Sequence, residues 1–105
     1  MTIDGDLDLL FGALADPTRR RILVALLERQ PMTTKQLAAR FPLTRWAIMK
    51  HLGVLRGARL VQTLPQERRR LHFVDPIRLA LVRDWLKTQT EVVPSSGRGS
   101  GATLG

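Results

Sequence analysis

The sequence predicts a mainly α-helical domain that carries one small β-hairpin. Apolar residues recur at the 3.6-residue period of an α-helix over most of the chain, and the period changes to two after Leu60. Asp-Pro pairs at residues 16–17 and 75–76 are typical helix starts, because Asp favours the N-cap position and Pro the first turn. With 105 residues, of which 44% are hydrophobic, the chain is expected to form a single core.

Two helices are predicted in the N-terminal third of the chain. The first covers about residues 6–14, with apolar residues at the spacing i, i+3, i+4 and i+7: Leu7, Leu10, Phe11 and Leu14. The second runs from Pro17 to about Arg29, and Pro31 stops it. Its predicted apolar face consists of Ile22, Leu23, Leu26 and Leu27.

The next two helices are predicted to form a helix-turn-helix. Thr33 or Thr34 caps a third helix, which carries Leu37, Ala38 and Phe41 and ends at Pro42. Thr44 caps a fourth helix, whose predicted buried face is Ile48, Leu52 and Leu55. A short helix, a tight turn and a second capped helix are typical of this motif, whose second, recognition helix enters the major groove of DNA.

The segments that follow predict a β-hairpin and a last helix. Strands are expected at residues 60–64 and 69–74, joined by a turn over residues 65–68 with a strongly basic tip. Two strands after the motif make a winged helix-turn-helix, and the last helix runs from Asp75-Pro76 to about Thr90. The fold is therefore predicted as five helices and a two-stranded wing. This domain is assigned to residues 1–93, and the Gly/Ser-rich residues 94–105 are expected to form a disordered tail.

The charge of the chain points to an anionic partner. Seventeen Lys and Arg against nine Asp and Glu give a formal net charge of +8, and residues 40–70 hold eight bases and one acid. Double-stranded DNA is the first candidate. The chain has no Cys, which excludes disulfides, thiolate metal ligands and cysteine nucleophiles. No apolar run reaches the ~20 residues of a membrane span and the N-terminus is acidic, so a cytoplasmic protein without membrane contact is expected.

Candidate DNA-binding residues lie on the recognition helix and the wing. Arg45 and Lys50 suit guanine acceptors, and Trp46 or Met49 suits a thymine methyl group. Three consecutive arginines on the hairpin fit a wing that grips phosphates or enters the minor groove, although a solubilising loop is the alternative. For His51, a structural role as a partly buried residue is at least as well supported as a base contact. Arg19, Arg20 and Arg21 are expected to form a solvated face. The predicted DNA-binding set is Thr44, Arg45, Trp46, Met49, Lys50, His51, Arg68, Arg69 and Arg70.

A dimer is predicted because the last helix is apolar on more than one side. Ile77, Leu81 and Trp85 form one row, and Leu79, Val82 and Leu86 another. One row is expected to pack on the core and the other on a second subunit, and a fully buried helix is the alternative. The predicted interface is Leu7, Leu10, Phe11, Leu79, Val82 and Leu86.

Several motifs in a fixed order resemble those of a known family. They are residues 14–23 (Leu-Ala-Asp-Pro-Thr-Arg-Arg-Arg-Ile-Leu), Leu37-Ala38, residues 50–55 (Lys-His-Leu-Gly-Val-Leu), Leu60-Val61 and the Arg-rich hairpin that ends at Asp75-Pro76. Together they resemble the ArsR-type repressors of bacteria and archaea, over residues 7 to about 88. The resemblance implies a homodimer whose first and last helices form the interface, and whose two recognition helices enter successive major grooves of a palindromic operator.

The chain also departs from that family. Thr33 and Lys35 stand where metal-sensing members carry Cys-x-Cys, and the last helix has Asp84 but no His, so no metal site and no cofactor are expected. Met49 replaces a Ser or Thr. Arg59 replaces a Gly at a left-handed helix exit, with Gly57 a candidate for that conformation instead. Glu67 replaces the wing-tip Gly, which is expected to reshape the turn.

The predicted function is repression of a palindromic operator by a homodimer, without metal sensing. The alternative is a winged-helix interaction module that is regulated by a protein partner rather than by reading DNA. With no Cys, no Tyr and two separated His, the sequence offers no catalytic constellation, and an enzyme is not expected.

Overall fold

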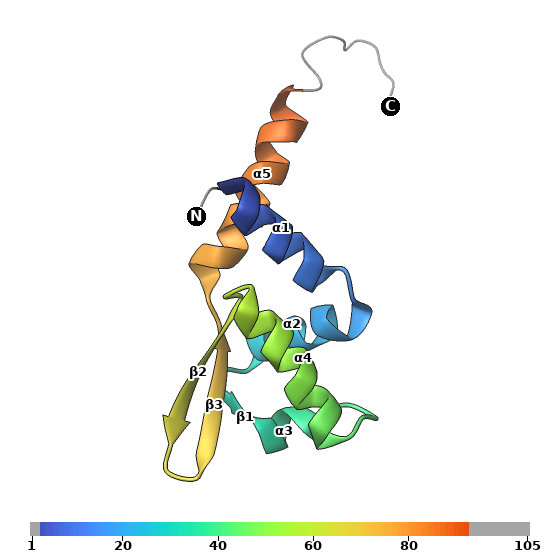
Figure 1. Cartoon of the computed structure of the whole chain (residues 1–105), viewed down its shortest axis with the longest axis vertical. Coiled ribbons are helices and arrows are strands. Elements are labelled where there is room, and N and C mark those ends of the chain that lie inside the picture. Colours follow the sequence, from blue (N-terminus) through green and yellow to red (C-terminus); the bar gives the residue numbers. More distant parts are fainter. Residues whose placement is uncertain (1–2, 93–105) are drawn as a thin grey trace.

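The computed structural model describes residues 3–92 and arranges them as a helical body with a projecting hairpin (Figure 1). The helices in this range are α1 (Ile3–Leu14), α2 (Pro17–Glu28), α3 (Thr34–Ala38), α4 (Arg45–Gly57) and α5 (Pro76–Val92). The strands β1 (Met32–Thr33), β2 (Val61–Gln66) and β3 (Arg69–Val74) form an antiparallel sheet in the order β1-β3-β2. The predicted five helices and the wing are confirmed, and the predicted tail lies outside the described residues.

Helix starts follow the predicted caps. Asp16 Oδ2 accepts a hydrogen bond from the Arg19 N–H at 2.9 Å, and Thr44 Oγ1 accepts one from the Ala47 N–H at 3.0 Å. Thr33, rather than Thr34, caps α3, in a reciprocal capping box with Gln36. These bonds satisfy N–H groups that have no partner within the helix, so each helix begins at a residue that the local sequence determines.

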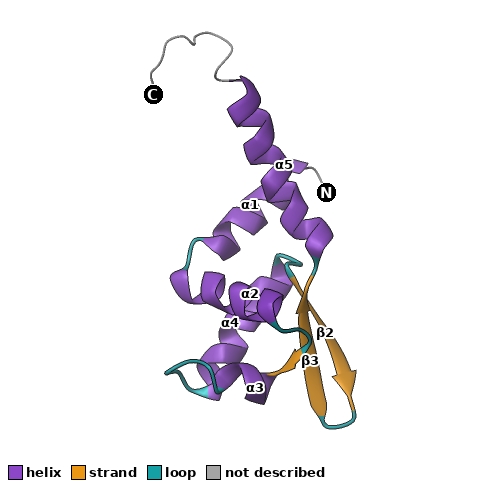
Figure 2. Ribbon diagram, turned by 180° about the vertical axis from the view of Figure 1, so that it is seen from behind, coloured by secondary structure: helices purple, strands orange, loops and turns teal. Residues whose placement is uncertain are grey.

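The sheet has a third strand that the sequence pattern does not predict. Met32 pairs with His72 and Thr33 with Leu71, so β1 lies on the edge of β3 opposite β2. A strand of two residues is too short to show a period of two. Its pairing connects the wing directly to the start of α3, and Figure 2 shows the hairpin extending beyond the helices at the end opposite α5.

The core takes residues from all five helices and from the sheet, and most of them follow the predicted helical periods. Ile48, Leu52 and Leu55 are buried on one face of α4, and Ile22, Leu23 and Leu26 on α2. Leu27 was wrongly assigned to this face: it is 50% exposed, and Ala25 is buried in its place. Phe41 lies after the end of α3 and packs half-buried against the core.

The structure corrects half of the predicted dimer interface. Leu7, Leu10 and Val82 are buried within the single chain, where α1 packs along α5 (Figure 1). Leu79 and Leu81 are half-buried against the same core. The exposed large apolar residues of this region are instead Leu9 and Phe11 on α1 and Ile77, Trp85 and Leu86 on α5. The two rows of α5 do not separate into an inner and an outer row, because α1 covers only part of its length.

Two residues have a left-handed backbone, with φ of 61° at Arg59 and 56° at Glu67. The helix exit predicted at Arg59 is confirmed. The suggestion that Gly57 adopts this conformation was wrong, because Gly57 is the last residue of α4 and no positive φ occurs there. No helix among residues 3–92 is both long enough and apolar enough to span a membrane.

Candidate nucleic-acid interface

The first turns of α4 present a polar and aromatic surface to solvent. Arg45, Trp46, Met49 and Lys50 are all exposed, on the side of the helix away from its buried leucines. Trp46 is 68% exposed, and the Lys50 ammonium lies 4.8 Å from the centre of its ring. This cation–π contact holds the lysine over the indole and limits its freedom. A tryptophan in this position gains nothing from the core, so it is available to a ligand.

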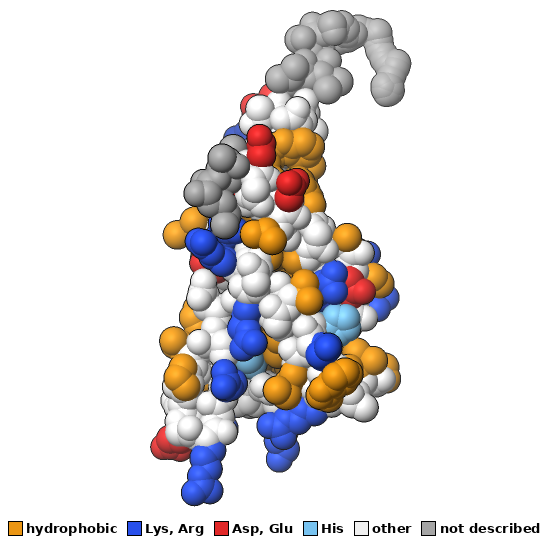
Figure 3. Space-filling model, in the orientation of Figure 1, with side chains coloured by type: hydrophobic (Ala, Val, Ile, Leu, Met, Phe, Trp, Pro, Cys, Tyr) orange, Lys and Arg blue, Asp and Glu red, His pale blue; other side chains and the backbone are white. Residues whose placement is uncertain are grey.

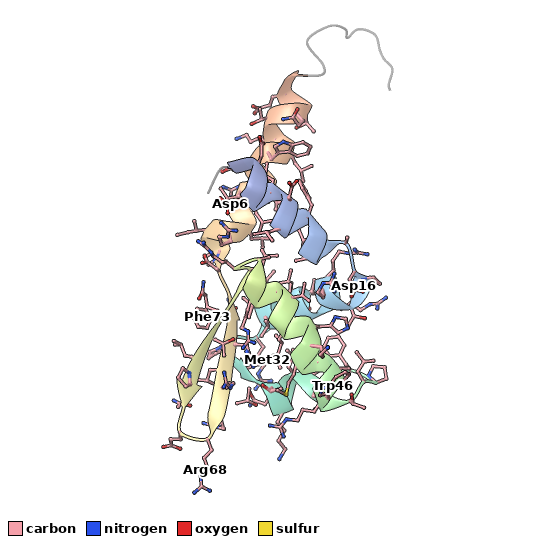
Figure 4. The ribbon with its side chains drawn as sticks, in the orientation of Figure 1. Asp6, Asp16, Met32, Trp46, Arg68 and Phe73 are labelled. Carbon is pink, nitrogen blue, oxygen red and sulfur yellow. The ribbon has the colours of Figure 1, made fainter. Side chains whose placement is uncertain are left out.

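The wing tip is a two-residue turn. Gln66 pairs with Arg69 across the hairpin, which leaves Glu67 and Arg68 as the turn residues. The left-handed φ of Glu67 allows this turn without glycine. Figure 4 places Arg68 at the hairpin tip and Trp46 near the start of α4, at the same end of the molecule. The wing tip and the start of the recognition helix therefore lie close enough to form one surface at this end of the molecule.

A basic groove runs between the wing and the helix-turn-helix. Its volume is about 460 Å³, and it is lined by the starts of α3 and α4 and by the tip of the hairpin: Thr33, Thr34, Lys35, Gln36, Arg45, Met49, Arg68, Arg69 and Arg70. Five of these residues are basic and none is acidic, and Figure 3 shows the Lys and Arg side chains at this end of the molecule. The groove thus collects four of the predicted arginines into one concave surface.

Lys35 belongs to this groove and was not predicted as a binding residue. It is an exposed residue of α3, a helix of only five residues. Nothing in the neighbouring sequence marks it, because the hairpin tip that faces it lies far along the chain. Trp46 and Lys50 do not line the groove but stand beside it on the exposed face of α4.

His72 connects the wing to the helix-turn-helix. The side chain is 2% exposed, with Nε2 2.7 Å from Thr34 Oγ1 and Nδ1 2.9 Å from Thr63 Oγ1. Burial lowers the pKa of His72 to about 4, and the charges of Arg56 and Arg70 contribute to the same shift. The imidazole is therefore neutral, and one ring nitrogen donates while the other accepts.

His51 lies outside the basic groove. Its Nδ1 is 3.9 Å from Asp16 Oδ2, and both side chains are partly buried. The backbone N–H of Arg19, more than His51, lowers the pKa of the Asp16 carboxyl below its ordinary value. This placement favours the structural role over a base contact. Asp16 thus connects the start of α2 with the recognition helix.

The predicted solvated face is confirmed for Arg20 and Arg21, which are exposed, and is wrong for Arg19, which is partly buried. Arg19 Nε donates to the Ala13 carbonyl at 2.7 Å, and Arg20 Nη1 donates to the Leu14 carbonyl at 2.7 Å. They cap the last turn of α1, whose carbonyl groups have no partner within the helix. These arginines stabilise the α1–α2 junction and are not available to the groove.

The described residues contain no group of three or more His, Cys, Asp or Glu that is arranged to hold a metal ion. The sequence as a whole contains no Cys. The groove therefore offers guanidinium, ammonium and hydroxyl groups, and its chemistry is that of an anion-binding surface.

Known proteins are similar to this chain in both sequence and architecture. A model described as a helix-turn-helix domain matches residues 14–63. The HTH-type transcriptional regulator Rv2034 of Mycobacterium tuberculosis is 43% identical over 76 residues, which cover 72% of this chain and 70% of that protein. The chain also resembles the crystal structure of an ArsR family transcriptional regulator, RHA00566, with a TM-score of 0.80 and 33% identity over 90% of this chain and 96% of the other.

A metal-sensing regulator is similar as well. The solution structure of the cadmium metal-sensor CmtR from Mycobacterium tuberculosis matches with a TM-score of 0.58 and 37% identity, over 93% of this chain and 97% of the other. These proteins are transcriptional regulators and not enzymes. With the winged helix-turn-helix and the basic groove in place, the chain belongs to the ArsR family of transcriptional regulators.

Proposed function

We propose that this regulator binds a palindromic DNA operator as a homodimer and represses the promoter that contains it. The basic groove carries the proposal, because five basic residues and no acidic residue line a concave surface between the wing and the recognition helix. Such a surface suits a duplex, whose phosphates follow the edges of the grooves that α4 and the wing would enter. A repressor acts here by occupying DNA that the polymerase needs.

The two parts of the surface have different roles in this proposal. Arg45 and Lys50 stand on the first turns of α4 and read base edges, with Trp46 and Met49 beside them for apolar contacts to thymine. Lys35, Arg68, Arg69 and Arg70 hold phosphates and set the register of the protein on the duplex. Base readers confer sequence preference, whereas phosphate contacts contribute affinity for any sequence.

The dimer interface is proposed at the exposed apolar residues of α1 and α5. Phe11 and Trp85 meet edge to face, with ring centres 5.4 Å apart, and Leu86 is 49% exposed on the same part of α5. We name these three residues the α1–α5 patch. A two-fold axis through this patch would present two copies of α4 to one duplex, as a palindromic site requires.

Regulation without a metal ion is also proposed. CmtR is a cadmium sensor, whereas this chain has no Cys to supply a thiolate ligand. Zinc, cadmium, arsenite and antimonite at low micromolar concentration are expected to leave operator affinity unchanged. The proposed control is the concentration of the regulator itself or a protein partner that covers α4. Stoichiometric release of DNA by one of these ions would overturn this part of the proposal.

The proposal is tested by binding to genomic fragments from the source organism, followed by sequencing of the retained DNA. A common inverted repeat is expected. Affinity for it should fall about 10³-fold or more between about 50 and 200 mM salt, because a dimer with six or more phosphate contacts releases that many counterions. Binding that barely changes with salt, or no binding at low salt, would favour the interaction module instead.

A further inference from the structure

A second, smaller pocket opens beside the basic groove, between α4 and β3. Its volume is about 180 Å³, and it is lined by Thr34, Met49, Leu52, Arg56, Arg70 and His72. Three of these residues, Thr34, Met49 and Arg70, also line the groove, so the two spaces adjoin. Figure 3 shows Lys and Arg side chains around a pale-blue His surface between the hairpin and α4. We name this space the α4–wing pocket.

The pocket holds two guanidinium groups and no acid. Among residues 3–92, neither Arg56 nor Arg70 forms a side-chain hydrogen bond or an ion pair. Both lie close enough to His72 for their charges to act on its imidazole. Because both ring nitrogens of His72 are engaged by Thr34 and Thr63, that residue has no free group to offer either arginine. Two like charges thus face one space without a counter-charge.

We propose that the α4–wing pocket binds a phosphoryl group between Arg56 and Arg70. Each guanidinium presents a planar fork of N–H donors that matches phosphate oxygens, and two forks together exceed the affinity of one. Arg56 is the residue that this proposal adds to the predicted DNA-binding residues. It lies in the last turn of α4, away from the predicted base readers. The phosphoryl group is either a phosphate of the DNA backbone, in which case the site rests on the proposed function, or free phosphate that reaches the pocket without DNA.

The first experiment measures operator binding by Arg56→Gln across a range of NaCl concentrations, with the selected duplex as probe. If the backbone supplies the phosphate, the slope of log affinity against log salt should become less steep by about 0.9 for each phosphate that the variant no longer neutralises. Affinity at about 100 mM NaCl should fall about fivefold or more, and it should fall equally on a random-sequence duplex. Arg56→Lys keeps the charge but removes the fork, and should give an intermediate decrease.

Arg59→Gln is the matched control for this experiment. Arg59 is exposed, lies three residues farther along the chain, carries the same charge and does not line either space. The substitution removes the same charge from the same region. Because Arg59 lines neither space, the slope of log affinity against log salt and the affinity itself should stay at the wild-type values. Equal decreases for the two variants would show a general effect of net charge and would overturn the backbone as the source.

The second experiment titrates inorganic phosphate into the DNA-free protein at constant ionic strength, with chloride as the reference anion. Shifts of the His72 ring and Arg56 side-chain resonances that saturate, and that Arg56→Gln abolishes, would identify free phosphate as the source. If neither experiment responds to Arg56→Gln, the site does not exist. If the wild type binds no DNA, the proposed function fails while the phosphate titration still decides this inference.

Discussion

The imidazole of His72 shows how one buried residue makes the stability of the wing depend on pH. Burial lowers its pKa from the ordinary 6.5 to about 4, so the folded protein binds this proton less tightly than the unfolded chain does. The stability that follows from this difference is complete above about pH 6.5 and is lost as the pH falls toward 4. The hydroxyls of Thr34 and Thr63 hold the neutral ring in place at neutral pH.

His72→Gln should therefore destabilise the protein more at neutral pH than in acid. Gln does not titrate, so the difference in free energy of unfolding between the two proteins should be about 2 to 3 kcal/mol at pH 7.5 and less than about 1 kcal/mol near pH 4.5. Urea denaturation at several pH values measures this difference. The contributions of carboxylates that titrate in both proteins cancel when the two free energies of unfolding are subtracted. A difference that stays constant with pH would contradict the neutral, buried imidazole.

The side chains of α4 and the wing should separate into base readers and phosphate contacts. Arg45→Ala and Lys50→Ala are each expected to cost about 1 to 3 kcal/mol on the operator and to relax the preference at particular base pairs. Arg69→Ala should weaken operator and random duplexes alike. Arg83→Ala is the control and should alter neither, because Arg83 is exposed on α5 and forms an ion pair with its neighbour Asp84. Competition against single-base operator variants measures these preferences, and three identical profiles would remove α4 as the reader.

At the scale of the elements, Arg78 joins three parts of the fold that the sequence does not connect. The side chain is 8% exposed; Nε and Nη2 donate to the Ala58 carbonyl at 3.3 and 3.1 Å, and Nη1 donates to Asp6 Oδ1 at 3.0 Å. These bonds tie α5 to α1 and to the end of α4. The elements proposed for dimerisation are thus attached to the end of the recognition helix.

Arg78→Met should destabilise the protein by about 3 kcal/mol, because it leaves the Asp6 carboxylate and the Ala58 carbonyl without their partner. Asp6→Asn should cost less, and the double variant should cost less than the sum of the two changes, since the residues share one interaction. Arg83→Met breaks an exposed ion pair and should cost below about 1 kcal/mol. Urea denaturation compares the four variants, and additive effects would show that Asp6 and Arg78 act independently.

At the scale of the whole molecule, the end of α5 leaves apolar surface that one chain does not cover. The last turns of this helix extend beyond α1, as Figures 1 and 2 show, and Trp85 and Leu86 are exposed on the middle turns that precede them. Phe11 and Trp85 meet edge to face, and Trp85 stays 40% exposed beside that contact. Exposed aromatic and aliphatic side chains in contact with one another are typical of a protein interface.

Trp85→Glu should convert the proposed dimer to a monomer without unfolding the chain, because the residue is 40% exposed in one subunit and a charge there opposes burial in the interface. Sedimentation should show the lower mass, and operator affinity should fall with it while circular dichroism stays helical. Ile77→Glu is the matched control, since Ile77 is 75% exposed on the same helix but lies outside the α1–α5 patch. Leu10→Glu is expected to unfold the protein, because Leu10 is fully buried. A monomeric wild type would refute the dimer.

The sequence by itself determined the features that depend on neighbouring residues. The caps at Asp16 and Thr44, the helical periods and the hairpin each involve residues a few positions apart, so local propensity decides them. The basic tip and the exposed face of α4 followed from the same patterns, and so did the resemblance to the ArsR family.

Only the tertiary structure decided which distant side chains meet. Thr34 and His72 are 38 residues apart and Asp6 and Arg78 are 72 apart, and nothing near any of them in the sequence marks the partner. Leu7, Leu10 and Val82 also follow an apolar period that does not say whether the same chain or a second chain covers them. A period identifies a face, whereas the packing of whole elements determines what that face touches, because burial depends on the position of the other helix and not on the residue itself.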